Sequence, residues 1–502
     1  MKSTTPSFVL ELPLNTNTVQ ESTILVRLDA GRQLYNACLG EALKRLDLLR
    51  QSKEFQQIRI LPKGKPRAQA FNDLNKKFEF TQYSLHHYAV GIRHGWLQEH
   101  INVHIAEKIA ARAFNAVQKK AFGKAKNVRF KGKNQFDTLE GQNNETGLIF
   151  ENNNLKWADL EIPCIIDKEN ELMSYGLQHR VKYCRIVKRK VNGKNKFYVQ
   201  LILEGKPYQD PEKELGKEEL GMDVGPSTYA AVGETRAELK QFCEELVPKW
   251  KEKRRLQRKL DRQRRANNPE HYNENGTVKK GKKKWKQSNH YKRTKSEITE
   301  LDRKTAAHRK SLHGHEQNII LTQGTVIKAE RIPYKSWQKI WGKSVSIRAP
   351  STFMSGLKRK AENAGGHFYD FPTNTTRLSQ ICHICGEAVK KPLSQRRHTC
   401  CGIDMQRDLY SAFLAKCIDV NTNSLDIARA RMLWPGLEPV LSEAVSRAYQ
   451  SANGGKIVPA SFGVGNRRQS GSPVKPEETV TEAADDVVQD TFYEDESRRE
   501  VT

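Results

Sequence analysis

Residues 219–234 read ELGMDVGPSTYAAVGE, and this stretch decides the fold class. Two short apolar runs flank a Gly-Pro-Ser turn, which is typical of two neighbouring strands. Asp223 lies inside the first run, where the chain otherwise buries itself, and a buried carboxylate is costly unless it is paired or binds a metal ion. The position therefore indicates a metal ligand in a buried sheet. The alternative is that Asp223 is a turn residue whose side chain hydrogen-bonds the backbone before Gly225.

Two more carboxylates stand in similar surroundings. Glu330 ends an apolar run, GTVIKAERI (324–332), and Asp408 opens a run with helical apolar spacing, RDLYSAFLAKCI (407–418). Each has a plainer explanation, because Glu330 could pair with a neighbouring lysine or arginine and Asp408 could face the positive end of a helix dipole. If the three converge, they would bind divalent cations, and two Mg²⁺ ions roughly 3.5–4 Å apart can catalyse in-line hydrolysis of a phosphodiester. Ligands that are all oxygens suit Mg²⁺ or Mn²⁺.

Crowded cysteines precede the third carboxylate, in CHICGEAVKKPLSQRRHTCCG (382–402). The first Cys-x-x-Cys pair predicts one half of a tetrahedral zinc site. The other half is open, because the side chains of adjacent Cys400 and Cys401 would point apart, whereas His398-x-x-Cys401 repeats the two-residue gap. A site closed by four protein ligands is structural and not catalytic. The predicted zinc ligands are Cys382, Cys385, His398 and Cys401, with Cys400 as the alternative to His398.

A large excess of positive charge points to nucleic acid as a partner. The formal net charge is +28, and ten of the 17 residues from 249 to 265 are Lys or Arg. Helical spacing here and at about 287–316 predicts a basic helical hairpin over 249–317. A merely solvated helix pair is the alternative, but charge this one-sided would repel itself in the absence of phosphates. The predicted nucleic-acid-binding residues are Lys251, Arg254, Arg255, Arg258, Lys259, Arg262, Arg265, Lys282, Lys283 and Lys284.

The rest of the chain divides by pattern. Residues 7–13 alternate like an edge strand, and helical periodicity fills the chain from about 30 to 126. Short strand-like runs follow to about 206, with a hairpin turn predicted at Val191-Asn192-Gly193-Lys194. Residues 466–502 hold ten Asp or Glu against five Lys or Arg and few apolar residues, which predicts a disordered acidic tail.

The composition also indicates a compartment. No apolar run has the length of a signal peptide core or the roughly 20 residues of a membrane span, so we expect no membrane partner. The cysteines outside the cluster are too scattered for a disulfide scaffold and fit free thiols in a reducing cytoplasm. They are Cys38, Cys164, Cys184, Cys243 and Cys417.

Taken in this order, the motifs resemble the TnpB family of transposon-encoded proteins and the compact type V CRISPR effectors related to them. GMDVGPS, VIKAERI and RDLYSAF resemble the three motifs of the family's split RuvC-like nuclease, with Asp223, Glu330 and Asp408 at the catalytic positions. LSQICHICG resembles the lead into its zinc element, and GRQLYNACL resembles its N-terminal helix. The resemblance spans roughly residues 7–435. The family's third motif continues Asn-Ala where this chain has Tyr410 and Ser411, and Gln406 replaces an aspartate.

The resemblance implies an α/β multidomain fold: an RNase H-like (RuvC) nuclease domain with an inserted zinc element, plus a wedge β-barrel and a helical recognition lobe. The implied parts are 1–29, first strand or strands of the barrel; 30–126, recognition lobe; 127–215, rest of the barrel; 216–381, nuclease with the hairpin 249–317; 382–402, zinc element; 403–435, end of the nuclease; and 436–502, a mostly disordered acidic tail.

The implied function is RNA-guided cleavage of DNA next to a short flanking motif, with Mg²⁺ or Mn²⁺ at the carboxylates and Zn²⁺ at the cysteines. Guide RNA and double-stranded target DNA are the expected partners, in the cytoplasm at the nucleoid; a homodimer is left open. Two alternatives remain: a guided DNA binder that does not cleave, and a guide-independent nuclease selective for DNA structure. Three intact carboxylates argue against the first alternative, and the long chain before the nuclease motifs argues against the second.

Overall fold

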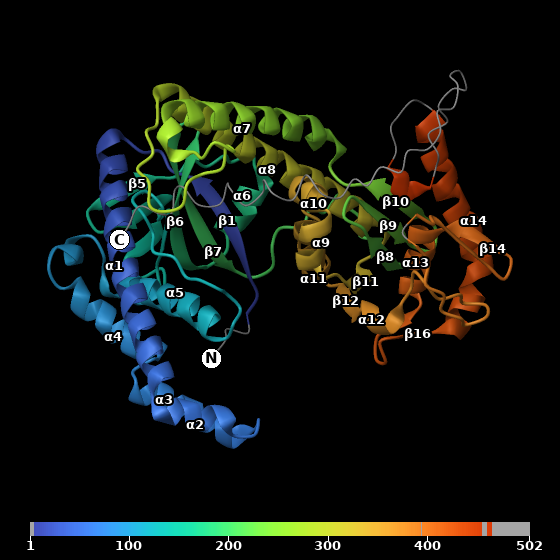
Figure 1. Cartoon of the computed structure of the whole chain (residues 1–502), viewed down its shortest axis with the longest axis horizontal. Coiled ribbons are helices and arrows are strands. Elements are labelled where there is room, and N and C mark those ends of the chain that lie inside the picture. The colour runs from blue at the N-terminus through green and yellow to red at the C-terminus, as the bar shows by residue number, and fades with distance from the viewer. Residues whose placement is uncertain (1–4, 393, 454–458, 464–502) are drawn as a thin grey trace. The chain divides into compact units, whose positions relative to one another are not determined.

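A computed structural model describes residues 5–392, 394–453 and 459–463 (Figure 1). The chain forms two compact units that divide between Tyr208 and Gln209. The predicted acidic tail, 466–502, lies outside the described residues. Within the described part of the chain, no helix combines the length and the apolarity that crossing a membrane requires.

The first unit contains two antiparallel sheets. One has the order β1-β7-β6-β2 and the other the order β3-β4-β5. A bridge between Leu14 and Cys164 connects the end of β1 to the end of β5. Asn192 and Gly193, both with positive φ, turn β6 into β7 where the sequence predicts a hairpin. The strands are β1 Ser7–Pro13, β2 Thr138–Glu140, β3 Leu148–Glu151, β4 Asn154–Trp157, β5 Leu160–Pro163, β6 Val181–Val191 and β7 Lys194–Glu204.

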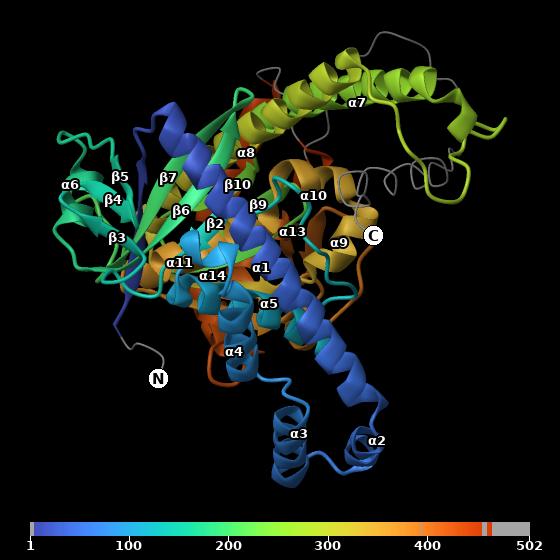
Figure 2. The same ribbon diagram turned by 90° about the vertical axis from the view of Figure 1, so that its left-hand side faces the viewer.

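Helices α1, α4 and α5 pack side by side in the first unit (Figure 2). Their shared core is the apolar stripe that the sequence shows, including Leu34, Cys38 and Leu46. Helix α1 begins at Thr18 and not near residue 30, because Asn17 and Gln20 form a reciprocal capping box that the sequence interpretation overlooked. The helices are α1 Thr18–Gln51, α2 Lys53–Ile60, α3 Lys65–Lys77, α4 Gln82–Arg93, α5 Val103–Ala121 and α6 Glu171–Leu177.

The second unit is built around one mixed sheet of order β10-β9-β8-β11-β12. Strands β8, β9 and β10 are antiparallel neighbours, whereas β11 runs parallel to both β8 and β12. The strands are β8 Glu219–Val224, β9 Thr228–Val232, β10 Ala237–Gln241, β11 Val326–Arg331 and β12 His367–Pro372.

Helices cover both faces of this sheet. Successive residues of β9 alternate between the two cores: Ala230 and Val232 pack with helices α13 and α14, and Tyr229 and Ala231 pack with helices α8, α10 and α11. The unit is therefore a three-layer α/β arrangement. These helices are α8 Asn289–Gln323, α10 Gly342–Arg348, α11 Pro350–Asn363, α13 Arg407–Lys416 and α14 Ile427–Asn453.

The expected disorder beyond residue 435 is wrong as far as residue 453. Helix α14 continues through this region and buries Leu437, Leu441, Ala444 and Ala448 in the core on the α13 side. These residues recur at helical spacing, and Pro435 and Pro439 inside the helix obscure the pattern in the sequence.

The basic segment forms two helices, α7 Val247–Asn267 and α8, that contact each other along their lengths. The chain between them is ordered at its base by Asn268, which is fully buried. Its side chain donates to the carbonyls of Arg264 and Lys286 and accepts from the Lys286 amide at 2.7 Å. The hairpin therefore has a folded tip and is more than a pair of charged helices.

Candidate active site

The strands β8 and β11 place two of the predicted carboxylates side by side. The register pairs Ala329 with Met222, so the next residue of each strand, Glu330 and Asp223, lies beside the other at the C-terminal ends of the two strands. The sequence could not give this register, because residues 225–325 separate the strands.

Gly221 brings helix α13 onto the same face of β8. A Cβ atom on Gly221 would lie 2.0 Å from the carbonyl oxygen of Ala412, so only glycine lets the helix backbone approach this closely. Gly221 and Asp223 share a face of the strand because they are two residues apart. Asp408 lies one helical turn before Ala412, in the first turn of α13. The contact at Gly221 therefore presents Asp408 toward Asp223.

The electrostatics agree with this convergence. The pKa of Asp223 is raised well above its usual value, first by burial and then by the Asp408 and Glu330 carboxylates. Burial also raises the pKa of Asp408, and it raises the pKa of Glu330 to about 7. Among the described residues, Asp223 has no cationic side chain within ion-pair distance, and Glu330 accepts hydrogen bonds from the Thr376 hydroxyl at 3.4 Å and from the Leu378 backbone. Among the described side chains, the one cation in ion-pair contact with these three buried carboxylates is Arg407, 3.9 Å from Asp408, so the group is a donor set that divalent cations complete.

The start of α13 is fixed by the two residues before Asp408. The Gln406 side chain accepts a hydrogen bond from the Leu409 amide at 2.7 Å and so caps the helix. Arg407 is buried, donates to the Pro392 carbonyl at 3.1 Å and lowers the pKa of Asp408. From the sequence we predicted neither the helix cap formed by Gln406 nor the contacts of Arg407 and Thr376. For Gln406 a signal was present, because a polar residue directly before a helical run commonly caps the helix.

The predicted zinc element gathers four thiols. The Cys385 and Cys400 sulfurs are 3.8 Å apart, the Cys400 and Cys401 sulfurs are 3.7 Å apart, and all four ligand atoms of the cluster Cys382, Cys385, Cys400 and Cys401 lie within 4.8 Å of one another. Sulfurs about 2.3 Å from a tetrahedral zinc ion are about 3.8 Å apart, so the group fits Zn²⁺. Among the described residues it is the only such group of His, Cys, Asp or Glu side chains.

The structure favours Cys400, the alternative, over His398 as the fourth ligand. Strands β13 Arg397–Cys400 and β14 Ile403–Gln406 are joined by Cys401 and Gly402, which have φ angles of 50° and 82°. Neighbouring side chains point apart in an extended strand, but the left-handed conformation of Cys401 turns its sulfur back toward Cys400. The preference for His398 in the sequence depends on an extended backbone at both cysteines, which Cys401 does not have.

His398 instead belongs to a buried aromatic contact beneath the thiols. Its ring stacks on Tyr410 with centroids 4.0 Å apart and an interplanar angle of 20°, and its Nδ1 is bonded to the Lys391 ammonium. The Tyr410 hydroxyl accepts from the His383 amide at 3.1 Å and lies 2.9 Å from the Nδ1 atom of the same residue. Since His383 lies inside the Cys-x-x-Cys turn, Tyr410 connects the thiol cluster to the helix that carries Asp408.

This connection gives a first prediction. Replacing Tyr410 with phenylalanine keeps the stack on His398 but removes both contacts to His383, so zinc retention should weaken by about 10- to 100-fold, the usual effect of losing an outer-shell partner. Release of zinc to a coloured chelator measures it. Tyr175→Phe makes the same chemical change in the first unit, where the hydroxyl donates to the Lys206 carbonyl, and should leave zinc release unchanged. Equal release from both variants would contradict the proposed connection.

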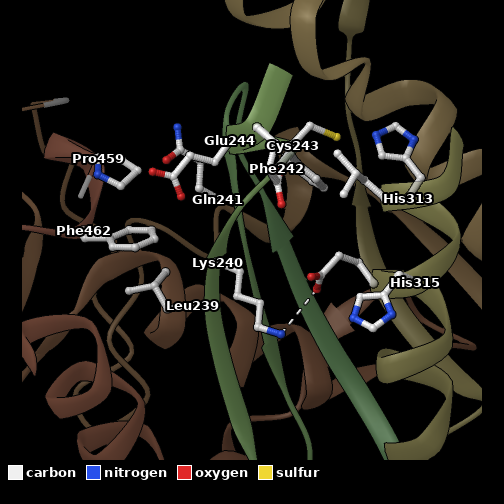
Figure 3. A pocket seen from close by; sticks show the side chains of 13 residues that line it. Leu239, Lys240, Gln241, Phe242, Cys243, Glu244, His313, His315, Pro459 and Phe462 are labelled. Atoms are coloured by element: carbon white, nitrogen blue, oxygen red, sulfur yellow. Dashed lines mark hydrogen bonds and ion pairs between the residues drawn. The ribbon is translucent and has the colours of Figure 1, made fainter. Parts of the chain in front are cut away.

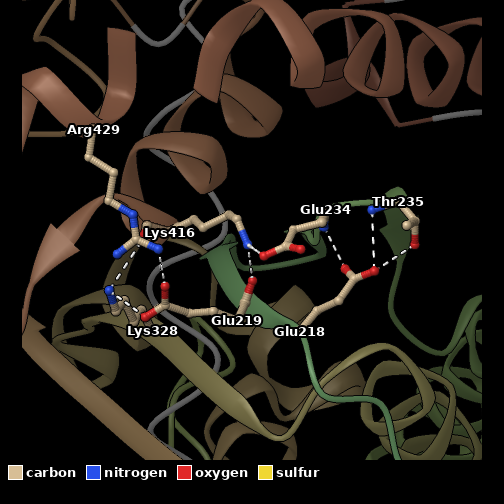
Figure 4. A network of polar contacts seen from close by, with 7 residues as sticks. All are labelled: Glu218, Glu219, Glu234, Thr235, Lys328, Lys416 and Arg429. Atoms are coloured by element: carbon tan, nitrogen blue, oxygen red, sulfur yellow. Dashed lines mark hydrogen bonds and ion pairs between the residues drawn. The ribbon is translucent and has the colours of Figure 1, made fainter. Parts of the chain in front are cut away.

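A network of charged side chains joins the elements that carry the three carboxylates (Figure 4). Lys328 is 3% exposed, and its ammonium lies 2.6 Å from Glu219 and donates to the Ile418 carbonyl at 2.6 Å. Lys416, fully buried on α13, bonds the Glu219 carbonyl, and Arg429 pairs with the Glu219 carboxylate. The network therefore joins β8, β11 and α13, the three elements that carry the candidate site.

Removing one charge from this network should be costly. Lys328→Met leaves buried carbonyls unpaired and is expected to lower the free energy of unfolding by about 3 kcal/mol, as is usual when one partner of a buried pair is lost. Urea denaturation followed by tryptophan fluorescence measures the change. Lys304→Met is the matched control, because Lys304 is 60% exposed where it pairs with Glu300, and it should cost less than about 1 kcal/mol. Similar midpoints for the two variants would refute a stabilising network.

The predicted nucleic-acid-binding residues lie on α7 and in the chain after it. Eight of the ten are exposed, whereas Arg254 and Lys283 are half-buried. Arg254 lies over the Trp250 ring at 5.8 Å, and Arg265 pairs with Asp261 at 2.7 Å. The exposed lysines and arginines on α7 form a long basic face, which is suited to contacting a phosphate backbone.

A cavity of about 450 Å³ in the second unit contains none of the predicted site residues (Figure 3). It lies along β10, and its lining includes Lys240, which pairs with Glu316 at 3.3 Å, together with Glu244 and Glu245. Three glutamates against one lysine make this cavity a poor site for phosphate. The candidate site therefore rests on the three carboxylates and not on this cavity.

Comparison with known proteins gives matches among solved structures. No family model matches the sequence, and no curated protein matches it. A solved structure described as a Cas12f1-sgRNA-target DNA complex has a TM-score of 0.40 and 12% identity, and the match covers 81% of this chain and 98% of that chain. A CRISPR-Cas12f ternary complex has a TM-score of 0.26 and 14% identity, with 79% and 82% covered. Both agree with the resemblance read from the motifs, but TM-scores below 0.5 add no argument of their own.

Proposed function

We propose that this protein is an RNA-guided DNA endonuclease that hydrolyses phosphodiester bonds at Asp223, Glu330 and Asp408. The observation that carries the proposal is the convergence of these carboxylates from β8, β11 and α13, in the order along the chain that the nuclease motifs require. A mixed sheet with helices on both faces supports an RNase H-like (RuvC) domain around them. In the first unit, the sheets and the helices α1 to α5 support a wedge β-barrel with a helical recognition lobe.

The three side chains fit a pair of Mg²⁺ or Mn²⁺ ions. A pair of ions roughly 3.5–4 Å apart needs several carboxylates around it, and these three side chains would supply them. Bound ions would supply an activated water and stabilise the departing oxygen. Asp223 lies on β8, which pairs with β11 and contacts α13 at Gly221, so it would hold the ions together with Glu330 from β11 and Asp408 from α13. Burial around the carboxylates strengthens their hold on the ions because it limits competing water.

Zinc holds the third carboxylate in place. The thiol cluster precedes β14, which leads directly into Gln406 and α13, so the fold of the zinc element sets where α13 begins. The closed set of four sulfurs leaves no position for substrate, which assigns this metal a structural role. The basic face of α7 is suited to contact the backbone of a guide–target heteroduplex or of a displaced strand.

Purification with and without co-expressed nucleic acid tests the guided part of the proposal. The protein should copurify with a defined RNA whose sequence carries one constant region and one variable region, because base pairing must select the target. Sequencing the bound RNA after mild lysis gives the result. Bulk cellular RNA of random sequence, or no RNA, would favour the alternative of a guide-independent nuclease.

A further inference from the structure

Three aromatic side chains form a ladder directly after Glu330. Helix α9 Tyr334–Ile340 leads into α10, and both follow β11 in the second unit (Figure 1). The ring centroids of Tyr334 and Trp337 are 5.7 Å apart at 86°, and those of Trp337 and Trp341 are 6.0 Å apart at 90°. Edge-to-face contacts of this kind fix the rings relative to one another, and each contact covers one face of one ring only.

The two tryptophans are not core residues. Both are half-buried, yet neither packs in the apolar core that holds Tyr334 at its border. Among the described residues neither indole N–H has a hydrogen-bond partner, and the neighbouring Ile340 is 70% exposed. Large aromatic surface that is left outside a core commonly marks a binding site.

The charge around the ladder is of one sign. Residues 331–361 contain eight Lys or Arg and no Asp or Glu. Lys335, Lys339 and Lys343 form no ion pair in the part of the chain that the structure describes. The Lys343 ammonium lies 4.4 Å from the centre of the Trp250 ring at the start of α7, so the basic face of that helix continues onto the ladder.

The ladder follows the C-terminal ends of the two strands that carry Asp223 and Glu330. Helix α9 begins at Tyr334, the fourth residue after Glu330. The Ser344 hydroxyl on α10 donates to the Pro226 carbonyl at 2.9 Å, in the turn that follows Asp223. The segment is therefore attached to the C-terminal ends of both β8 and β11, beside the candidate catalytic residues.

We propose that Tyr334, Trp337 and Trp341 form a stacking platform for the bases of single-stranded DNA. Unpaired bases expose the faces that aromatic rings contact, and lysines beside the rings meet the phosphates. Duplex DNA hides those faces, so the platform selects single strands. Its role of delivering a strand to the carboxylates rests on the proposed function, whereas the binding itself does not.

Two oligonucleotides separate stacking from charge. The full chain with Asp223→Asn, which should not cut the probe, is titrated into a fluorescein-labelled 12-residue oligothymidylate and into an abasic strand of the same length. The intact ladder should bind the thymidylate more tightly than the abasic strand. Trp337→Ala with Trp341→Ala should weaken thymidylate binding by about tenfold or more and leave abasic binding unchanged, because stacking is lost and the phosphate contacts remain.

Conservative and remote variants complete the design. Trp337→Phe with Trp341→Phe keeps two rings and should give an intermediate affinity for thymidylate, which protects the test if the alanine variants unfold. Trp96→Ala removes a tryptophan that is 50% exposed in the first unit and should change neither affinity. Equal binding of the two strands by the intact ladder, or an equal loss of both in the alanine variants, would overturn the platform. If the protein prefers thymidylate but purifies without any defined RNA, the platform stands and the proposed function fails.

Discussion

Asp223→Asn should lower the rate of DNA cleavage by at least about 10³-fold while leaving the affinity for target DNA unchanged. Asparagine is nearly the same size as aspartate but lacks the negative charge that holds two cations. Asp223 is the residue whose pKa both other carboxylates raise, and its strand, β8, contacts both β11 and α13. Single-turnover cleavage of a target matched to the bound guide measures the rate, and a filter-binding assay measures the affinity.

The same substitution should change how metal affects stability. Without divalent ions the three carboxylates repel one another, so Asp223→Asn should unfold at a higher temperature than the unmodified protein. Added Mg²⁺ should raise the unfolding temperature of the unmodified protein and have a smaller effect on the variant. Asp404→Asn is a suitable control, because Asp404 is exposed and pairs with Arg397 outside the group. Cleavage by Asp223→Asn at the rate of the unmodified protein would refute the catalytic assignment.

Cys400→Ser should release the zinc ion and abolish cleavage, whereas His398→Ala should retain one zinc ion per chain. Structural zinc sites contribute several kcal/mol or more to folding, about 10–16 kcal/mol in isolated zinc-finger peptides, so losing one thiolate should unfold the cluster. The effect reaches Asp408 because β13 and β14 lead from the cysteines into α13. Elemental analysis of the purified protein gives the zinc content.

Two controls make this prediction specific. Cys38→Ser alters a buried free cysteine in the first unit and should leave the zinc content at one. His398→Ala removes the stack on Tyr410 and should lower stability without removing the metal. Zinc lost from His398→Ala but kept in Cys400→Ser would restore the histidine ligand that the sequence favoured.

The sequence predicted local features better than it predicted how they meet. Asp223 was identifiable because one acidic residue interrupts an apolar run, and the four cysteines because of their density. The parallel register that sets Glu330 beside Asp223 depends on contacts across a hundred residues, which no local pattern records. Gly221 shows the same limit: its importance comes from the carbonyl of Ala412, which is distant in sequence.

The errors have identifiable physical causes. Choosing His398 followed from treating Cys401 as extended, whereas its φ is 50° and the turn redirects its sulfur. The late start assigned to α1 came from overlooking the Asn17–Gln20 capping box. The missed helix α14 contains two prolines, and those residues hide a regular stripe of buried leucines and alanines. The Tyr334–Trp341 ladder has no distinctive signal in the sequence, because aromatic residues at helical spacing usually belong to a core.

One measurement tests the central claim most directly: cleavage of two DNA duplexes that differ only in their match to the RNA bound by the purified protein. Both duplexes carry the same flanking sequence, and each is incubated with Mg²⁺ or with a chelator. The account predicts that the matched duplex is cleaved in Mg²⁺. The unmatched duplex should stay intact in Mg²⁺, and both duplexes should stay intact in the chelator. Cleavage that ignores the match, or that persists in the chelator, would contradict a guided nuclease built on Asp223, Glu330 and Asp408.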